Sequence, residues 1–187
     1  MANSSLFIKI DATTELHLLA EDDAASVYQL IESNRAYLRE WLPWIDYTQS
    51  IEDERSFISN TRTQYQNNQS FTYTIWHQQQ IAGIAGYNQI DWANRKTEIG
   101  YWLATQYQGQ GIMTRSCHAL IEYAFDDLKL HTVEIRCATM NTRSCAIPLR
   151  LGFTQEGIMR QAEWLYDHFV DHRLYGLLKS EWQLQRL

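Results

Sequence analysis

Apolar residues recur along the chain with two alternating spacings. Residues 6–10 and 16–19 carry them at the short spacing of strands, whereas residues 21–38 and 50–65 carry them three and four positions apart, as in helices. Ser50 opens the second helical segment and an acidic residue follows three positions later, a pattern typical of a helix start. The first third of the chain therefore predicts two strands and two helices.

The middle of the chain predicts an antiparallel meander and then a helix. Residues 71–77, 81–89 and 96–103 have strand-like patterns, and short polar turns separate them. A loop at 106–111 contains two glycines and leads into helical spacing over 112–128. A strand, a glycine loop and a helix are therefore expected in succession.

The last third predicts a short strand at 132–138, a short helix at 143–151 and closing strands at 153–157 and 169–178. No internal repeat or Gly/Ser/Pro-rich linker divides the sequence. We therefore predict one α+β domain over residues 1–187, in which helices flank a mixed sheet.

Composition and charge narrow the class of ligand. The 187 residues are 45% hydrophobic and 20% charged, which is typical of an ordinary folded protein. The 16 basic and 22 acidic residues give a net charge of -6, which argues against nucleic acid as a partner. A local basic region could still hold one small phosphorylated ligand.

Three cysteines, Cys117, Cys137 and Cys145, lie in apolar stretches without a Cys-x-x-Cys pair, which favours a reduced protein. Residues 1–10 do not resemble a secretion signal, and no apolar run approaches the roughly 20 residues that span a bilayer. We therefore expect a cytoplasmic protein that does not bind a membrane.

The most informative segment is the glycine loop at 106–111. Gly109 and Gly111 allow a tight turn with outward-facing amides, and the following helix adds the positive end of its dipole, so the loop can bind a phosphate. A dinucleotide fingerprint would need a third glycine where Thr114 stands, and the Gly-Lys-Ser/Thr of a Walker loop is missing. The alternative is a turn that merely joins strand to helix.

Several motifs in one order resemble a known family. Gln-x-x-Gly-x-Gly at 106–111, after Glu-Ile-Gly-Tyr-Trp-Leu at 98–103, resembles the acetyl-CoA signature of the GNAT N-acetyltransferases. Asn-x-x-Ser at 141–144 and Leu-Gly-Phe-x-x-Glu-Gly at 151–157 are similar to the later family motif. Three further segments resemble the RimL-type ribosomal-protein N-terminal acetyltransferases: Asn-Arg-Ala-Tyr-Leu at 34–38, Trp-Leu-Pro-Trp at 41–44 and Gln-Ala-Glu at 161–163.

The resemblance implies the GNAT fold, with a mixed, mostly antiparallel central sheet flanked by helices. Two of its strands, here about 97–103 and 132–138, splay apart, and the pantetheine arm of acetyl-CoA lies in the gap. The co-substrate would be held, largely through backbone groups, by Ile99, Tyr101, Leu103, Gln106, Gln108, Gly109, Gln110, Gly111, Ile112, Met113 and Asn141. Arg115 is a candidate for a further phosphate contact, or an exposed helix residue.

The resemblance also assigns the chemistry. Glu163 is expected to accept the proton of the amine, and Ser144 to protonate the sulfur of CoA. The alternatives are a helix-cap residue for Ser144 and a solvated carboxylate for Glu163.

Two clusters of side chains are harder to assign. The aromatic residues Tyr37, Trp41, Trp44 and Tyr47 either line the acceptor pocket or pack in the core. His168 and His172, with Asp167 and Asp171, suggest a metal site, but two histidines four residues apart on a strand are separated by roughly 13 Å. We therefore expect no metal. A Gly-x-Ser-x-Gly motif, which would indicate a serine hydrolase, is also missing.

The sequence thus predicts an acetyl-CoA-dependent N-acetyltransferase whose acceptor is the α-amine of a peptide or ribosomal protein. Two alternatives stay open: an enzyme for small amines (an amino acid, a peptide antibiotic or an aminoglycoside), and a CoA-binding module without turnover. The sequence leaves the oligomeric state open, with a homodimer as the default symmetric assembly.

Overall fold

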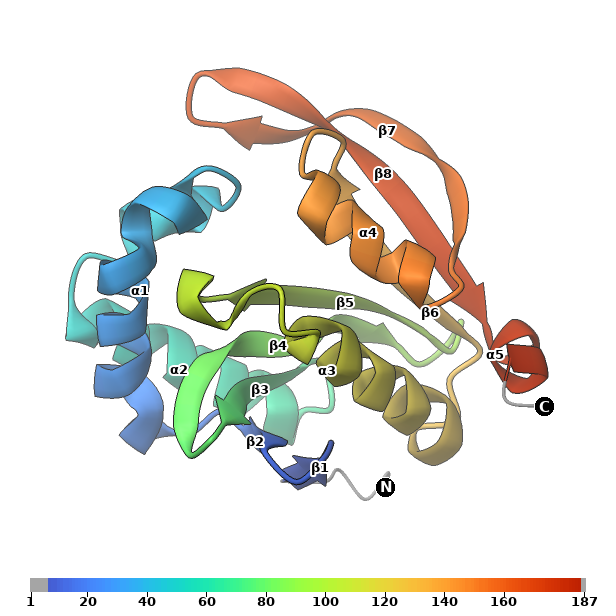
Figure 1. Ribbon diagram of the computed structural model, residues 1–187, viewed down its shortest axis with the longest axis horizontal. Helices are drawn as coiled ribbons and strands as arrows, with labels where there is room; N and C mark the ends of the chain where they lie inside the picture. Colours follow the sequence, from blue (N-terminus) through green and yellow to red (C-terminus); the bar gives the residue numbers. More distant parts are fainter. Residues whose placement is uncertain (1–6, 186–187) are drawn as a thin grey trace.

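The computed structural model describes residues 7–185, in which eight strands form one sheet with the order β1-β2-β3-β4-β5-β6-β8-β7 (Figure 1). The predicted strand at 6–10 corresponds to β1, and its Leu6 lies outside the described residues. The strands are β1 (Phe7–Lys9), β2 (Thr14–Leu18), β3 (Phe71–His77), β4 (Gln80–Asp91), β5 (Lys96–Leu103), β6 (Thr132–Ala138), β7 (Thr154–Leu165) and β8 (His168–Leu178). The helices are α1 (Ala24–Arg39), α2 (Ile51–Gln66), α3 (Ile112–Glu122), α4 (Thr142–Arg150) and α5 (Lys179–Gln185).

Neighbouring strands of this sheet run antiparallel except at one place. Among the described strands, β5 and β6 are the parallel pair, and their residue pairs cover only Lys96–Glu98 and Thr132–Glu134. Beyond these pairs β5 continues to Leu103 and β6 to Ala138, so the two strands diverge and the sheet opens between them (Figure 1). The predicted mixed, mostly antiparallel α+β fold is confirmed.

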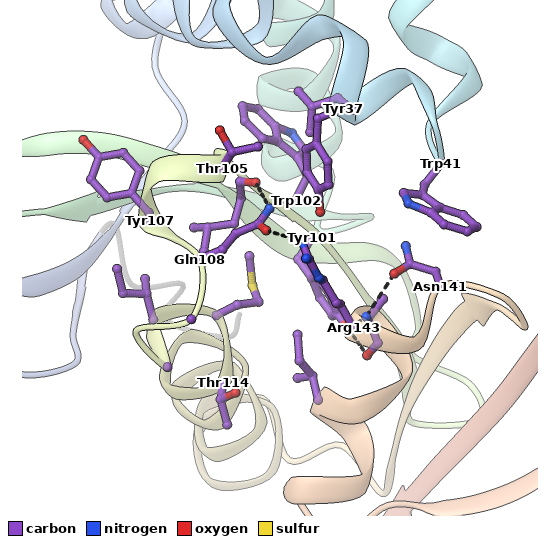
Figure 2. Close-up of a pocket in the computed structure, with 18 of the residues that line it drawn as sticks. Tyr37, Trp41, Tyr101, Trp102, Thr105, Tyr107, Gln108, Thr114, Asn141 and Arg143 are labelled. Carbon is purple, nitrogen blue, oxygen red and sulfur yellow. Dashed lines mark hydrogen bonds between the residues drawn. The ribbon is translucent and has the colours of Figure 1, made fainter.

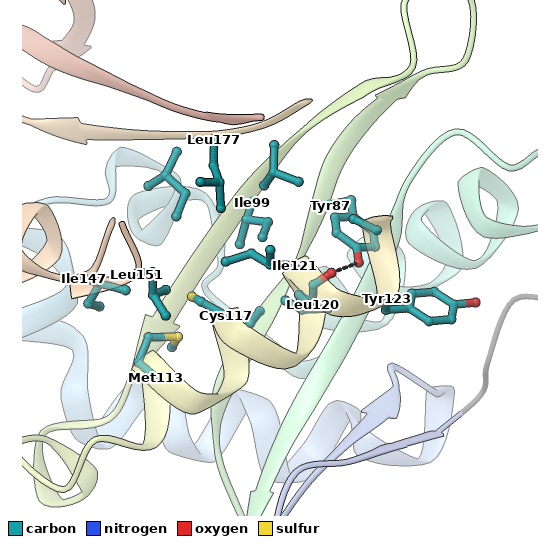
Figure 3. Packing of buried hydrophobic residues seen from close by; sticks show 14 of the residues in the cluster. Tyr87, Ile99, Met113, Cys117, Leu120, Ile121, Tyr123, Ile147, Leu151 and Leu177 are labelled. Atoms are coloured by element: carbon teal, nitrogen blue, oxygen red, sulfur yellow. Dashed lines mark hydrogen bonds between the residues drawn. The ribbon is translucent and has the colours of Figure 1, made fainter. Parts of the chain in front are cut away.

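The helices cover different faces of the opened sheet. Helices α1 and α2 pack on one face of the β2–β5 half, where Ile84 and Trp102 join the apolar cluster of α1. Helix α3 packs on the other face, with Cys117 and Leu120 in the same cluster as Ile99 of β5 (Figure 3). Helix α4 packs against β6 on the far side of the opening.

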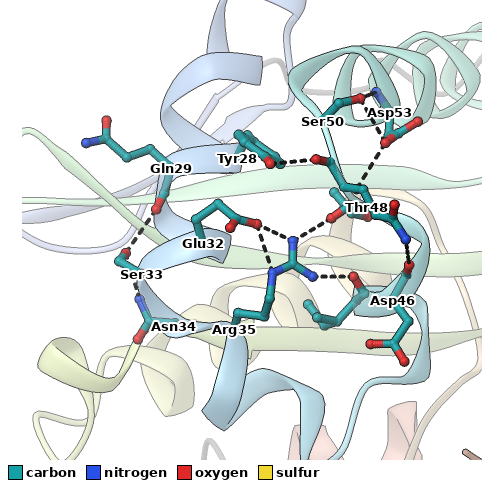
Figure 4. Close-up of polar contacts among 12 residues, drawn as sticks. Tyr28, Gln29, Glu32, Ser33, Asn34, Arg35, Asp46, Thr48, Ser50 and Asp53 are labelled. Carbon is teal, nitrogen blue, oxygen red and sulfur yellow. Dashed lines mark hydrogen bonds and ion pairs between the residues drawn. The ribbon is translucent and has the colours of Figure 1, made fainter.

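Hydrogen bonds and an ion pair of Arg35 hold the segment that follows α1. The Arg35 guanidinium donates to the carbonyl oxygens of Ile45 and Thr48 and pairs with Glu32 (Figure 4). Ser50 then caps α2 by accepting a hydrogen bond from the Asp53 amide at 3.1 Å, which confirms the predicted helix start. The segment between α1 and α2, which borders the site described below, is therefore held against α1.

Two parts of the prediction were wrong. The closing strand predicted at 153–157 continues to Leu165, because register shifts in β7 break the alternation on which the prediction depended. The short helix α5 was not predicted, since only Trp182 in it is buried. The predicted helix at 112–128 is confirmed, although its last part, Tyr123–Asp127, has π-helical bonding.

A buried carboxylate lies in the layer between α2 and the rest of the fold. Glu54 is 2% exposed, and its Oε1 atom has no hydrogen-bond partner among the described residues. Ile51 and Ile58, one turn to either side, belong to the apolar cluster around α1. Burial raises the pKa of Glu54 to about 7, because a charged carboxylate loses its hydration there.

This raised pKa predicts a loss of stability as the pH rises. Glu54 ionises near its ordinary pKa when unfolded but only near 7 when folded, so the penalty for the buried charge grows between these two values. We compare the free energy of unfolding of Glu54→Gln with that of the wild type, measured in urea. Between pH 5 and pH 8 we expect this difference to change by roughly 2 kcal/mol in favour of the variant. Glu52→Gln, at an exposed position of the same helix, is the control. An equal difference at both pH values would contradict the assignment.

Candidate active site

A cleft of about 980 Å³ lies where β5 and β6 diverge. Its walls come from the end of α1, the end of β5, the glycine loop, the first turn of α3, and α4 (Figure 2). The residues predicted from sequence that line it are Tyr101, Leu103, Gln108, Gly109, Gly111, Ile112, Met113, Asn141 and Ser144. Those that do not are Ile99, Gln106, Gln110 and Glu163.

The glycine loop takes the backbone shape that its sequence requires. Gly109 and Gly111 both have φ of +73°, a left-handed conformation that residues with a Cβ rarely adopt. Gly111 is the N-cap of α3, so the free amides of the first turn point out of the helix at this end of the cleft. Gln106 and Gln110 are exposed, and the Gln110 side chain donates to the Gln106 carbonyl. Ile99 is buried in the apolar cluster that packs against α3.

Three arginines, Arg115, Arg143 and Arg150, line the same end of the cleft. Arg143 donates to the side chain of Gln108 at 3.0 Å, and Arg150 approaches the hydroxyl of Thr114 at 3.5 Å. Arg143 and Arg150 were not predicted as site residues, although their spacing of seven residues on a predicted helix places them on one side of it. A protein of net charge -6 therefore concentrates positive charge where an anion would be bound.

Arg115 is bound to other groups of the protein. Its Nε donates to Asp11 at 2.9 Å and its Nη1 to the Gln110 carbonyl at 3.0 Å. The backbone amide of Thr13, assisted by Arg115, lowers the pKa of Asp11 to about 2, so this carboxylate stays charged beside the guanidinium. Arg143 and Arg150 therefore have more of their charge available to a ligand than Arg115.

The N-terminus of α4 carries Asn141 and Ser144. Asn141 is the N-cap residue, and its side-chain oxygen accepts the Ser144 amide at 3.1 Å while the residue also lines the cleft. The Ser144 hydroxyl lies 3.2 Å from the Tyr101 hydroxyl and 3.2 Å from the Cys137 sulfur. Burial raises the pKa of Tyr101 well above its ordinary value and that of Cys137 to about 12, so both groups are neutral at physiological pH.

The aromatic cluster divides between two roles. Tyr37 and Trp41, at the end of α1, line the cleft (Figure 2). Trp44 packs against Trp102 with ring centroids 6.4 Å apart, and Tyr47 is 81% exposed. Two of the four aromatic residues are therefore placed to contact an acceptor in the cleft.

The cleft passes through the sheet and reaches both faces. Alternate residues of a strand point to opposite faces, and along β5 Tyr101 packs with the α3 cluster while Trp102 packs with the α1 cluster. Cys137 touches Ser144 and so points to the α4 face of β6. A molecule in the cleft can therefore be approached from the α3–α4 side and from the α1 side.

Glu163 lies on β7, outside the lining of the cleft, and on the α1 side of the sheet. Cys137 pairs with Arg173 in the register of β6 and β8, so the next residue, His172, points to the opposite face. The Glu163 carboxylate lies 3.1 Å from the His172 ring and thus on that same face. Ser144 and Glu163 are placed on opposite faces of the opening.

The described residues also bear on the questions of metal binding and membrane insertion. Residues 7–185 contain no group of three or more His, Cys, Asp or Glu side chains arranged to hold a metal ion. No helix in this part of the chain is long and apolar enough to span a membrane.

Comparison with known proteins gives a consistent result. Residues 14–154 match the family model described as an acetyltransferase (GNAT) domain. The chain is 35% identical to the Ribosomal-protein-serine acetyltransferase of Escherichia coli strain K12, over 90% of this chain and 94% of that protein. It is also 35% identical to the Putative ribosomal N-acetyltransferase YdaF of Bacillus subtilis strain 168, over 94% and 96%.

Solved structures agree with these relatives. The structure of RimL, a ribosomal L7/L12 alpha-N-protein acetyltransferase in complex with coenzyme A, has a TM-score of 0.91 and 32% identity, covering 94% of this chain and 99% of that one. The microcin C7 self immunity acetyltransferase MccE, in complex with acetyl-CoA and AMP, has a TM-score of 0.89 and 31% identity, covering 95% and 98%. The chain therefore belongs to the GNAT family of acetyltransferases, and its relatives include the RimL-type ribosomal-protein acetyltransferases.

Proposed function

We propose that this acetyltransferase moves the acetyl group of acetyl-CoA to the α-amine of a peptide or protein, with a ribosomal protein as the natural acceptor. The observation that carries this proposal is the cleft that crosses the opened sheet, with Ser144 on one face and Glu163 on the other. Relatives that act on ribosomal proteins support the choice of acceptor.

The shape and charge of the cleft fit acetyl-CoA. Its volume of about 980 Å³ is within the range of cofactor sites, and one end carries the glycine loop and three arginines. We assign the phosphates to the amides of 108–113, assisted by Arg143 and Arg150, and the pantetheine arm to the edge of β5 at 99–103. We assign Asn141, which lines the cleft at the N-terminus of α4, to the same arm.

In this proposal Glu163 and Ser144, on opposite faces of the opening, each carry out one proton transfer. The neutral amine attacks the thioester carbonyl, the new C–N bond forms, and the C–S bond breaks to leave the CoA thiolate. Glu163 accepts the proton that the attacking amine loses, and Ser144 donates a proton to the thiolate, so the products are the amide and CoA thiol. Proton exchange with solvent then removes the proton from Glu163 and returns one to Ser144. Tyr101 and Cys137 hold the Ser144 hydroxyl in place.

A second acceptor class is supported by one specific observation. The similarity to MccE, a microcin C7 self immunity acetyltransferase bound to AMP, favours a small amine that carries a nucleotide or peptide group. Tyr37 and Trp41 offer aromatic faces that would suit an aromatic base.

A panel of amines separates these acceptors. The purified protein is incubated with acetyl-CoA and a peptide with a free N-terminus, the same peptide with a blocked N-terminus and one lysine, or an aminoacyl nucleotide, and release of CoA thiol is followed. We expect the free N-terminus to react fastest. An α-amine of pKa near 7.8 is about 14% neutral at pH 7, whereas a lysine amine is only about 0.04% neutral. Preference for the nucleotide would favour the second candidate, and no thiol release with any amine would contradict turnover.

Ser144 provides a test of the proposed acid. We expect Ser144→Ala to lower kcat by roughly 100-fold, with little change in acetyl-CoA affinity, because the lost hydroxyl acts on the leaving sulfur. Thr142→Ala, an exposed change in the same turn of α4, is the control and should keep full activity. Unchanged kcat in a folded Ser144→Ala protein would leave Ser144 with a structural role only.

The pH dependence of Glu163→Gln tests the proposed base. The variant should lose most activity at pH 6 to 7, where a base must take the amine proton, and recover part of it above the pKa of the amine, where the neutral form is abundant. Rates of peptide acetylation between pH 6 and 9.5 measure this, with Glu156→Gln on the same strand as control. A constant ratio to the wild type across this range would be incompatible with a base at Glu163.

A further inference from the structure

Two neighbouring residues of β8, Asp171 and His172, both reach across to β7 around Glu163. In the sequence, the spacing of Asp171 and His172 with Asp167 and His168 suggests a metal site. In the structure the two histidines have different partners. His168 pairs with the exposed Asp167 at 2.7 Å, whereas His172 lies 3.1 Å from Glu163. The motif therefore divides into a solvent-exposed pair at the hairpin end and a pair at the proposed base.

The backbone of β7 is bulged next to Glu163. The register passes from Met159–His172 to Glu163–Val170, so β7 uses four residues where β8 uses two. Within the bulge Gln161 has φ of +51°, a conformation that stores strain in a residue other than glycine. Bulges of this kind change the direction of the side chains that follow them, and Glu163 is the first residue back in register.

Asp171 holds this bulge in place. Its Oδ1 atom accepts the hydrogen bond of the Gln161 amide at 2.8 Å, which satisfies a backbone donor that the bulge removes from the strand pairing. A strained residue persists only where its surroundings fix it, and this hydrogen bond is such a restraint.

His172 holds the carboxylate itself. Its Nε2 atom lies 3.1 Å from Glu163 Oε2, and because an ionised carboxylate can only accept, the ring nitrogen donates. The His172 side chain is 18% exposed and that of Glu163 is 34% exposed, so the hydrogen bond is partly shielded while the carboxylate keeps contact with solvent. One carboxylate oxygen is thus bound to His172, and the other is left to take a proton.

We propose that His172 is a positioning residue for Glu163, and that Asp171 supports it by fixing the bulge that aims the glutamate into the face of the opening where the amine arrives. This inference rests on the proposed role of Glu163 as base. A flexible glutamate on a strand near the edge of a sheet has several rotamers, and a fixed carboxylate is in reach of the amine for a larger fraction of the time. His172 does not line the cleft and acts through Glu163.

A double-mutant cycle tests this role. The kcat for the free-amine peptide is measured at pH 7 for the wild type, His172→Ala, Glu163→Gln and the double variant, with the KM for acetyl-CoA and thermal unfolding as further readouts. We expect His172→Ala to lower kcat roughly tenfold in the wild type and to have no effect in the Glu163→Gln background, with KM for acetyl-CoA unchanged. His168→Ala is the matched control and should leave kcat unchanged.

Conservative replacements keep the test decisive if His172→Ala is unstable. His172→Gln retains an N–H donor and should keep most of the activity. Asp171→Ala should lower kcat, whereas Asp171→Asn, whose amide oxygen can still accept the Gln161 amide, should restore it. An equal loss from His172→Ala in both backgrounds, or full activity of His172→Ala in a folded protein, would overturn the inference.

The cycle also separates this inference from the proposed function. If Glu163→Gln alone retains wild-type kcat at pH 7, the base assignment fails and the positioning role fails with it. If Glu163→Gln is impaired and His172→Ala is not, only the positioning role fails.

Discussion

The short parallel pairing between β5 and β6 is the constraint on which the site depends. It joins Lys96–Glu98 to Thr132–Glu134. Beyond these residues the described parts of β5 and β6 are no longer paired with each other. Backbone donors and acceptors in such an opening need other partners, and a ligand that carries amides can supply them. The opening also brings the glycine loop after β5 close to α4 after β6, so that both line one cleft.

The same opening separates the residue proposed as acid from the residue proposed as base. Because strand side chains alternate between faces, Cys137 and Ser144 lie on the α3–α4 side of the gap, and His172 and Glu163 on the α1 side. The proposed acid, Ser144, and the proposed base, Glu163, would then act on the thioester and on the amine from opposite directions without neutralising one another. A closed sheet would allow neither approach.

Most of the fold could be predicted from sequence because its elements keep a regular spacing and its glycine loop has one conformational requirement. Gly109 and Gly111 take the left-handed backbone expected of them. The extent of β7 could not be predicted, since the bulge at Gln161 breaks the alternation of the strand. Nor could the pairing of His172 with Glu163, because hydrogen bonds between strands depend on register, which is not visible in local spacing.

Hydrogen exchange measured by mass spectrometry, with and without acetyl-CoA, tests the central claim that the open edge of β5 and the glycine loop bind the co-substrate. Saturating acetyl-CoA should slow amide exchange in fragments covering 99–103 and 106–113. Fragments of α2, none of whose residues line the cleft, should change little. Protection confined to other segments, with unchanged exchange at 99–113, would contradict the account.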